Sequence, residues 1–388
     1  MTAAAPTDTP AASPQGLTLF LAGDVMLGRG IDQILPHPGD PRLYEGFMHD
    51  ARGYVRLAEA RNGPIPRGAR FDYVWGDLLP ELARLAPAFR IVNLETSVTA
   101  AGSPEWKGIN YRMHPENVGS LLAAGVDCCV LANNHVLDWG EAGLADTLSV
   151  LAQARIATAG AGLDQERAEA PAVLERPGRG RTLVYAFAVA SSGVPPAWAA
   201  RPGHPGVAFL ADASEHSLGR VGAVLARDRR PGDVTLVSLH WGANWGYEIP
   251  PEQRGFAHRL IRAHGVDVVF GHSSHHPLGI EVYRGRPILY GAGDLINDYE
   301  GITDNEEYRG DLTLAYFLEL DAAGHLLSLC MAPFRINRFR LSRASSSDAS
   351  WLAGVLAREG GRLGTRVRLA PDGSSSLEWR ADAAAEAP

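Results

Sequence analysis

The amino-acid sequence predicts an α/β protein whose central sheet is covered on both faces. Eight short apolar segments of strand length, rich in β-branched residues, recur along the chain, and most are continuously apolar. Continuous apolar runs are typical of strands buried on both sides. Helix-like stretches separate several of these segments, which favours a layered architecture. With 46% hydrophobic and 21% charged residues among 388, the chain has ample material for a large core.

The predicted strands follow one another from residue 17 to residue 320. The first, LTLFLAG, begins at Leu17 and ends before Asp24. The others are AFRIVNLE (88–95), VDCCVLANN (126–134), TLVYAFAV (182–189), DVTLVSLH (233–240), VDVVFGH (266–272), PILYGAGD (287–294) and TLAYFLEL (313–320).

Helices are predicted between these strands, over ENVGSLLAAG (116–125), EAGLADTLSVLAQA (141–154) and PEQRGFAHRLIRAHG (251–265). Segments 36–76 and 190–212 lack such patterns, and their lengths predict functional insertions or a lid.

The chain divides into three predicted regions. Residues 1–16 are rich in alanine, proline and threonine and lack the basic and apolar parts of a signal peptide, so we expect a disordered leader. Residues 17–337 form the main domain. Residues 338–388 form a C-terminal extension with two edge strands, RVRLAPDG and SLEWRA, and a disordered end.

Composition excludes several classes of partner. Lys+Arg 36 against Asp+Glu 44 gives a net charge of −8 without a basic block, which disfavours nucleic-acid binding. No segment approaches the ~18 apolar residues of a membrane span. Three cysteines, Cys128, Cys129 and Cys330, cannot form a disulfide framework and fit a reducing compartment. We therefore expect a cytoplasmic protein without nucleic-acid or membrane partners.

Residues with metal-binding or proton-transfer capacity follow five predicted strands. They are Asp24, Glu95, Asn134 with His135, His240, and His272. The carboxyl ends of strands in layered α/β proteins border a crevice in which sites form. Each residue alone has a simpler explanation, since an aspartate such as Asp24 also suits a turn or a helix N-cap. Five coincidences together favour a site for a divalent cation.

Six motifs occur in a fixed order: GDVMLGR (23–29), VNLET (92–96), LANNHVLDWG (131–140), HWG (240–242), GHSSHH (271–276) and YGAGDLINDYEG (290–301). Together they resemble the CapA-like family, which is named for poly-gamma-glutamate capsule synthesis and belongs to the calcineurin-like metallophosphoesterase superfamily. The resemblance spans residues 17–301. It implies a four-layer α/β/β/α sandwich with a metal site at the carboxyl ends of strands, and it makes 17–337 the catalytic domain.

The metal ligands that the resemblance implies are Asp24, Glu95, Asn134, His240 and His272. The chain departs from the superfamily pattern at two ligand positions, where Met26 and Ser274 replace histidines. A thioether is a poor ligand for a hard cation. We therefore expect one well-formed metal site, which disfavours the two-metal hydrolysis of phosphodiesters.

The identity of the cation stays open at the level of the sequence. The resemblance implies calcium, and the oxygen donors Asp24, Glu95 and Asn134 suit it. Manganese or zinc would instead be expected to bind His240 and His272.

Additional histidines and carboxylates are available for proton transfer. They are His135, His275, His276, Asp138 and Asp294. Pairing with a carboxylate fixes the tautomer of an imidazole and raises its basicity. Two reactions suit such a site. One is the hydrolysis of a gamma-glutamyl, other amide or phosphoester bond, and the other is epimerisation, in which a base removes an alpha proton and an acid returns it on the opposite face.

More narrowly, the chain resembles the CapA-like epimerases of lasso-peptide biosynthesis, which invert the C-terminal tryptophan of a ribosomal precursor peptide. This resemblance implies a calcium-dependent mechanism with two His/Asp pairs. We therefore predict a peptide epimerase, with the hydrolase and a non-enzymatic subunit of polymer export as alternatives. Arg29 is predicted to bind the C-terminal carboxylate of the peptide, and Trp241 and Trp245 its aromatic or extended parts.

Overall fold

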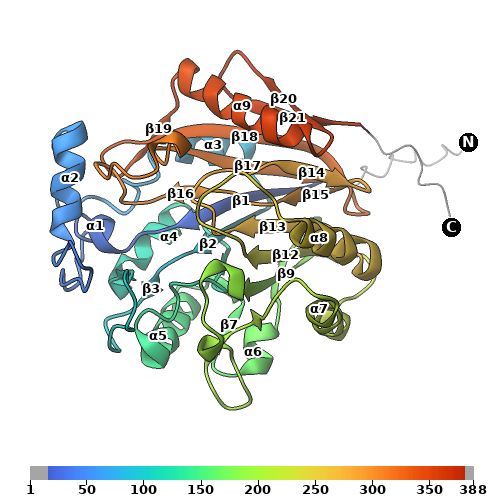
Figure 1. The fold of residues 1–388 in the computed structure, drawn as a ribbon, viewed down its shortest axis with the longest axis horizontal. Helices are drawn as coiled ribbons and strands as arrows, with labels where there is room; N and C mark the ends of the chain where they lie inside the picture. The colour runs from blue at the N-terminus through green and yellow to red at the C-terminus, as the bar shows by residue number, and fades with distance from the viewer. Residues whose placement is uncertain (1–15, 381–388) are drawn as a thin grey trace, which may run out of the picture.

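Two β-sheets form the centre of the fold in the computed structural model, which describes residues 16–380 (Figure 1). Residues 1–15 and 381–388 lie outside this range, and with them most of the leader and the end that the sequence predicts to be disordered. Both sheets are largely parallel at the strands that carry the motifs.

The larger sheet has ten strands among the described residues. In spatial order they are β20 (Thr365–Leu369), β21 (Ser375–Trp379), β18 (Leu326–Ile336), β17 (Leu312–Leu320), β1 (Leu17–Val25), β2 (Phe89–Leu94), β5 (Cys128–Val130) and β6 (Ala157–Ala159), with β16 (Asp294–Ile296) beside β1 and β19 (Leu341–Arg343) beside β18.

The second sheet has seven strands in the same range. Their order is β11 (Phe209–Leu210), β9 (Gly180–Val189), β12 (Val234–His240), β13 (Val268–His272), β15 (Arg286–Leu289) and β14 (Ile280–Tyr283), with β8 (Ala172–Arg176) beside β9. Two short pairs complete the strands, β10 (Gly206–Val207) with β7 (Ala161–Gly162) and β3 (Ser97–Val98) with β4 (Arg112–Met113).

Helices cover the sheets. They are α1 (Arg29–Asp32), α2 (Arg52–Asn62), α3 (Leu78–Leu85), α4 (Gly119–Ala123), α5 (Gly140–Gln153), α6 (Gln165–Glu169), α7 (Glu215–Asp228), α8 (Pro251–His264) and α9 (Ser346–Gly361), with short 3-10 turns η1 (Pro115–Val118), η2 (Ala190–Ser192), η3 (Pro196–Trp198) and η4 (Glu306–Tyr308). Within residues 16–380 no helix is long and apolar enough to cross a membrane.

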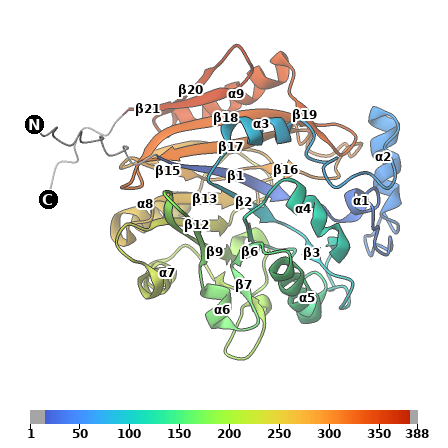
Figure 2. The ribbon, with the colours of Figure 1, turned by 180° about the vertical axis from the view of Figure 1, so that it is seen from behind.

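The packing of β9 shows how the layers form. Ala186 and Ala188 belong to the apolar core shared with the larger sheet, whereas Tyr185 and Phe187 pack in a second core with α7 and α8. Successive side chains of a strand point to opposite faces, so an unbroken apolar run suits a strand between two layers. Helices α7 and α8 lie on one side of the sheet pair and α3, α4 and α5 on the other (Figures 1 and 2). The predicted four-layer α/β/β/α sandwich is confirmed.

Each predicted strand segment contains a strand of the structure, namely β1, β2, β5, β9, β12, β13, β15 and β17. The predicted helices over 141–154 and 251–265 correspond to α5 and α8, and 116–125 forms η1 and α4. The expectation that 36–76 lacks helical structure is wrong, because α2 lies within it. The proline- and glycine-rich flanks of α2 conceal its apolar face in the sequence.

The C-terminal region joins the larger sheet. Strands β20 and β21, which correspond to the two predicted edge strands, form an antiparallel pair, and β21 pairs with β18. Helix α9, absent from the sequence prediction, packs against β20, β18 and β14. The division of the chain at residue 338 stays a prediction.

Candidate metal centre and acid–base site

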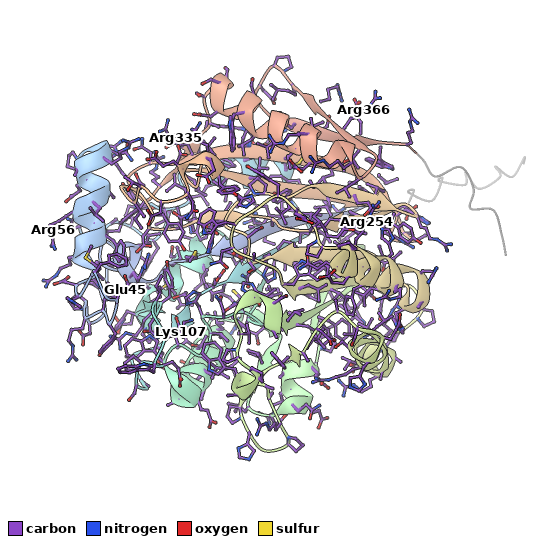
Figure 3. The ribbon with its side chains drawn as sticks, in the orientation of Figure 1. Glu45, Arg56, Lys107, Arg254, Arg335 and Arg366 are labelled. Carbon is purple, nitrogen blue, oxygen red and sulfur yellow. The ribbon has the colours of Figure 1, made fainter. Side chains whose placement is uncertain are left out.

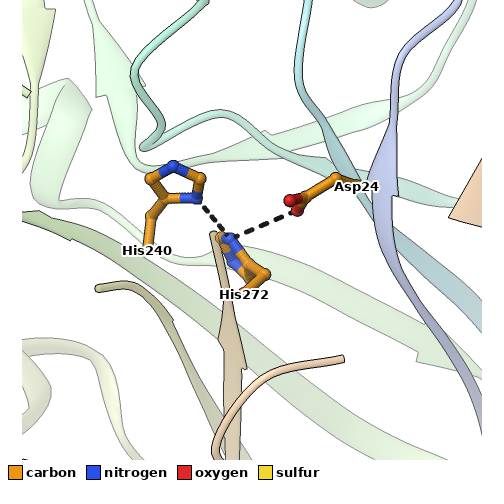
Figure 4. Close-up of side chains that lie close together, drawn as sticks. All are labelled: Asp24, His240 and His272. Carbon is orange, nitrogen blue, oxygen red and sulfur yellow. Dashed lines mark hydrogen bonds and ion pairs between the residues drawn. The ribbon is translucent and has the colours of Figure 1, made fainter. Parts of the chain in front are cut away.

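The predicted metal ligands meet where strands of the two sheets end. His240 and His272 are the last residues of β12 and β13 and lie opposite each other in the parallel register. Asp24 lies near the end of β1, where it is in register with Asp294 of β16. Figure 4 shows Asp24, His240 and His272 converging on one point.

Two glycines allow β1 and β16 to approach closely. A Cβ atom on Gly23 would lie 1.8 Å from the carbonyl oxygen of Gly293, which is far inside any permitted contact. The backbone N–H of Asp24 donates to that same oxygen over 3.0 Å. The glycines thereby bring the carboxyl-bearing residues Asp24 and Asp294 side by side.

The donor atoms of all five predicted ligands are close together. The Nδ1 atoms of His240 and His272 are 2.7 Å apart, and Asp24 Oδ1 is 3.8 Å from His272 Nδ1. Glu95 Oε1 is 3.9 Å and Asn134 Oδ1 3.2 Å from His240 Nε2. Two ligands of one cation, each about 2.0 to 2.5 Å from it, lie roughly 3 to 4 Å apart. Asp24, His240 and His272 have donor atoms within 4.8 Å of one another and form one possible ligand set. Glu95 and Asn134 lie against the other ring nitrogen of His240, so they would bind the same cation only after a side chain reorients.

The buried carboxyl groups of the site indicate whether it suits a cation. Asp24 and Glu95 are 0% and 1% exposed, and Asp24 Oδ2 has no hydrogen-bond partner. Burial, followed by repulsion from Asp294, raises the pKa of Asp24 to about 6, and burial together with Asp24 raises the pKa of Glu95 well above its usual value. Asn93 donates to Asp24 Oδ1 over 2.7 Å but adds no charge. Two adjacent buried carboxyl groups and an unpaired oxygen are what a divalent cation would neutralise, so the residues fit one.

The first histidine–carboxylate pair is His135 with Asp138, 2.6 Å between Nδ1 and Oδ2. This contact leaves His135 Nε2 3.8 Å from Glu95 Oε1. Lys107, labelled in Figure 3, donates to Asp138 Oδ1 over 2.7 Å and lies 3.3 Å from His135 Nδ1. Burial, opposed by Asp138 and assisted by Lys107, lowers the pKa of His135 to about 4.

The second pair is His275 with Asp294, 2.8 Å between Nδ1 and Oδ1. Asn297 donates to the other oxygen of Asp294 over 2.7 Å. Donor atoms of Asp24, His275 and Asp294 lie within 4.8 Å of one another. Burial alone would lower the pKa of His275, but the charge and hydrogen bond of Asp294 outweigh it, and the pKa is raised. The site thus holds two His–Asp pairs beside one carboxylate pair, which consists of Asp24 and Glu95.

Two tyrosines support these histidines. The Tyr111 ring packs edge-on against His135 with centroids 4.7 Å apart, and Tyr299 does the same to His275 at 5.5 Å. Their hydroxyl oxygens are 3.3 Å apart. The tyrosine pair therefore links the two imidazoles through side-chain packing. The sequence offered no signal for it.

Lys107 was also absent from the predicted site, although the sequence contains a signal. It is the only lysine among the 36 basic residues of the chain. Arginine is always charged and presents a broad fork, whereas lysine is a compact ammonium. A single lysine among basic residues that are otherwise all arginine therefore marks a candidate site residue.

The contacts of Arg29 differ from those that its predicted role requires. It is buried, and its guanidinium donates to Asp298, to Glu45 over 3.0 Å and to Tyr54 over 3.1 Å. It also lies 4.3 Å from the ring centre of Tyr111. These partners occupy the donors with which the sequence predicts it to bind a peptide carboxylate, and that role stays a prediction.

The two predicted substrate-binding tryptophans differ in location. Trp241 is buried in the second core, where its indole donates to the Tyr290 carbonyl over 2.9 Å and its ring packs against Phe256. Trp245 is half-buried, with its ring centre 5.3 Å from that of His275. The structure therefore brings only Trp245 of this pair to the histidines.

His276 lies beside the site with both ring nitrogens in contact with the backbone. Its Nε2 accepts from the Gly246 N–H over 3.1 Å, and its Nδ1 is 3.4 Å from the Pro277 carbonyl oxygen. Tyr308 stacks on the ring at 4.4 Å. These contacts favour a supporting role over proton transfer, which stays a prediction.

Known proteins are similar to the part of the chain that contains the six motifs. The model of the bacterial capsule synthesis protein PGA_cap family matches residues 18–299. The chain belongs to this family. PGA_cap relatives include a probable polyglutamine synthesis accessory protein of Mycobacterium tuberculosis, 49% identical over 365 residues that cover 93% of this chain and 96% of the relative. The PGA biosynthesis protein CapA of Bacillus subtilis is 25% identical over 284 residues, 73% of this chain and 63% of that protein.

Among solved structures, a 5'-nucleotidase precursor from Thermus thermophilus is similar with a TM-score of 0.43 and 17% identity. The match covers 89% of this chain and 59% of that one.

Proposed function

We propose that this PGA_cap protein is a metal-dependent enzyme that inverts the α-carbon of a peptide residue by proton transfer. The observation that carries the proposal is the pair of His–Asp contacts beside one carboxylate pair. His135 approaches Glu95, and His275 approaches Asp24. Inversion needs two groups that exchange a proton with one carbon, and this arrangement supplies two.

The proposed cation ligands are the five predicted residues Asp24, Glu95, Asn134, His240 and His272. When bound, the cation would polarise the carbonyl group next to the reacting carbon. The family resemblance favours calcium, and the paired imidazoles of His240 and His272 suit manganese or zinc.

The protein's own residues hold and move the protons. Asp138 and Asp294 bind Nδ1 of His135 and His275, which leaves each Nε2 for the substrate. One histidine takes the α proton, and the electron pair of the broken C–H bond passes into the carbonyl group. The other histidine gives its Nε2 proton to the opposite face of the carbon, which completes the inversion.

The proposed substrate is the C-terminal tryptophan of a ribosomal precursor peptide of the lasso type, processed in the cytoplasm. The half-buried Trp245 beside His275 supports an aromatic substrate residue. The narrower motif resemblance to lasso-peptide epimerases supports the same substrate.

Hydrolysis of a gamma-glutamyl amide bond is the second candidate. It is supported by the printed names of the relatives, which refer to polyglutamine synthesis and PGA biosynthesis. In this reaction one histidine would activate water instead of removing an α proton.

Incubation with a candidate precursor peptide in D2O, with added Ca2+, Mn2+ or Zn2+ and with EDTA, tests both reactions by tandem mass spectrometry. Epimerisation predicts a cation-dependent gain of one deuteron at the C-terminal residue of an intact peptide. Hydrolysis predicts truncated peptide carrying solvent oxygen. Absence of both products with every cation would contradict the proposal.

Matched variants sharpen this test. His135→Gln and His275→Gln should each lower the exchange rate about 100-fold or more. His325→Gln is the control, because His325 also pairs with an aspartate, Asp321 at 3.2 Å, but is half exposed on the surface. Its exchange rate should match the wild type.

A further inference from the structure

A shallow hollow is lined in part by residues that neighbour Tyr111 and Asp138 in the chain. Its space, including the open mouth, is about 240 Å³, and its lining includes Arg112, Trp139 and Asn110. The residues Arg42 and Asp40 form part of the same lining.

Arg112 is a half-buried cation without a carboxylate partner among residues 16–380. Its guanidinium lies 3.6 Å from the ring centre of Trp139 and donates to the backbone oxygen of Asp40 over 3.3 Å. The Asp40 side chain is engaged elsewhere, since it forms an ion pair of 2.6 Å with Arg42. The other lining arginine, Arg29, is bound by two carboxylates. Arg112 is thus the arginine of the lining that forms no ion pair within the described chain, although the charges of Asp40 and Asp32 act on it from farther away.

A second donor in the lining also lacks a partner. The indole Nε1 of Trp139 is buried and has no acceptor within the described part of the chain, and Trp139 is 5% exposed. Buried donors are nearly always hydrogen-bonded in native proteins, so each exception needs an explanation. An acceptor supplied by a ligand provides one.

Two lining residues are chain neighbours of the proton-transfer site. Trp139 follows Asp138 in the chain, and Arg112 follows Tyr111, whose backbone N–H donates to Asp138 Oδ2 over 2.6 Å. The backbone that carries Arg112 and Trp139 therefore also positions the partner of His135.

We propose that Arg112, stacked on Trp139, binds a carboxylate group of the substrate in this hollow. A planar guanidinium binds carboxylates through two parallel hydrogen bonds, and stacking on an aromatic ring fixes its plane. The Trp139 indole N–H supplies a further donor. The inference rests on the proposed peptide substrate, because it assigns to Arg112 either the C-terminal carboxylate of the reacting residue or the acidic side chain of a nearby residue.

This carboxylate has two chemical sources, the C-terminus of a peptide or an acidic side chain. Two short peptides separate them, one with glutamates and an amidated C-terminus, and one with glutamines and a free C-terminus. Calorimetric titration with each peptide uses the full chain after EDTA treatment and removal of the EDTA by desalting, because divalent cations and the carboxylates of EDTA would both compete with the test. A peptide with glutamines and an amidated C-terminus provides the baseline.

We expect one carboxylate peptide to bind the wild type about tenfold more tightly than the baseline peptide. Arg112→Gln should abolish this difference, and Arg112→Lys should restore only part of it because an ammonium lacks the fork. Trp139→Phe, which keeps a ring under Arg112, should weaken binding several-fold. Arg70→Gln is the matched control, since Arg70 is exposed, pairs with Asp72 over 3.0 Å and is not part of the lining, and it should bind within twofold of the wild type.

The inference is overturned if the wild type binds all three peptides equally, or if Arg112→Gln and Trp139→Phe both keep the preference for a carboxylate. Deuterium exchange is measured separately. Carboxylate preference without exchange would support the subsite while contradicting the epimerase proposal, and exchange without carboxylate preference would do the reverse.

Discussion

Replacement of Asp24 by asparagine is expected to stabilise the protein when EDTA removes cations, and to abolish its stabilisation by cations. Asp24 Oδ2 is buried without a hydrogen-bond partner, next to the equally buried Glu95. In Asp24→Asn, Oδ1 still accepts from Asn93, while the amide N–H₂ takes the place of the unpaired oxygen and donates toward Glu95. The variant thus removes a charge repulsion without leaving a cavity.

The size of the effect follows from the pKa of Asp24, which is raised from 3.8 to about 6. A carboxyl group with a raised pKa in the folded state costs no stability below pH 3.8. It destabilises the protein increasingly up to about pH 6, and by a constant amount above that. Two pH units correspond to about 3 kcal/mol. In EDTA, Asp24→Asn should therefore exceed the wild type by on the order of 2 to 3 kcal/mol at pH 8, and by little at pH 4.

Urea unfolding in EDTA at both pH values measures this difference, and melting with and without each cation measures the loss of binding. Asp298→Asn is the control. Asp298 is also buried, but its carboxylate accepts from the Arg29 guanidinium over 3.1 Å and from the Gly30 N–H over 2.9 Å. Losing one acceptor there should cost about 1 to 3 kcal/mol. If Asp24→Asn were no more stable than the wild type at pH 8, the account of an uncompensated carboxylate pair would be refuted.

Three further outcomes are expected. Gly23→Ala should lose about 3 kcal/mol in urea unfolding, together with cation-induced stabilisation, because its Cβ would lie 1.8 Å from the Gly293 oxygen; unchanged stability would contradict this close approach. Lys107→Met should raise the pKa of His135, since the ammonium lies 3.3 Å from Nδ1. NMR titration of the His135 ring in EDTA measures this pKa, and an unchanged value would contradict the prediction. Glu281→Gln should destabilise the protein by about 2 kcal/mol at pH 7 and by roughly half that at pH 3, judged by urea midpoints. Burial raises the pKa of Glu281, but hydrogen bonds from His258 and other neighbours outweigh burial and lower the pKa to about 2. The ionised Glu281 therefore stabilises the protein fully at pH 7 and progressively less below pH 4.5. An equal loss of stability at both pH values would refute this account of Glu281.

The sequence predicted that the proposed ligands lie at strand ends, because local patterns determine where strands end. An apolar run that stops at a polar residue reveals both the strand and its end, and parallel strands bring such ends together. The His135–Asp138 pair is also local, three residues apart. The different surroundings of His240 and Trp241 could have been predicted from the periodicity of a strand. Neighbouring residues of a strand face opposite sides, so a site-facing His240 implies a core-facing Trp241.

Long-range partners could not be predicted in this way. Arg29 is bound by Asp298, which is 269 positions away, and no local pattern shows that its donors are occupied. The pairing of His275 with Asp294, 19 positions apart, depends likewise on how the segment after β13 meets β16. Contacts of this kind arise from the packing of whole strands, which the order of motifs alone does not specify.

The solitary lysine makes the site chemically addressable. Reagents that acylate or reductively methylate primary amines leave guanidinium groups untouched, so within the chain they have one side-chain target, Lys107, besides the terminal amine. Its side chain is 27% exposed while its ammonium contacts Asp138. The rate of its modification therefore reports whether the His135–Asp138 pair is covered, because a peptide bound over this pair also covers Lys107. Mass spectrometry of a single tryptic region would then report occupancy without a known reaction product.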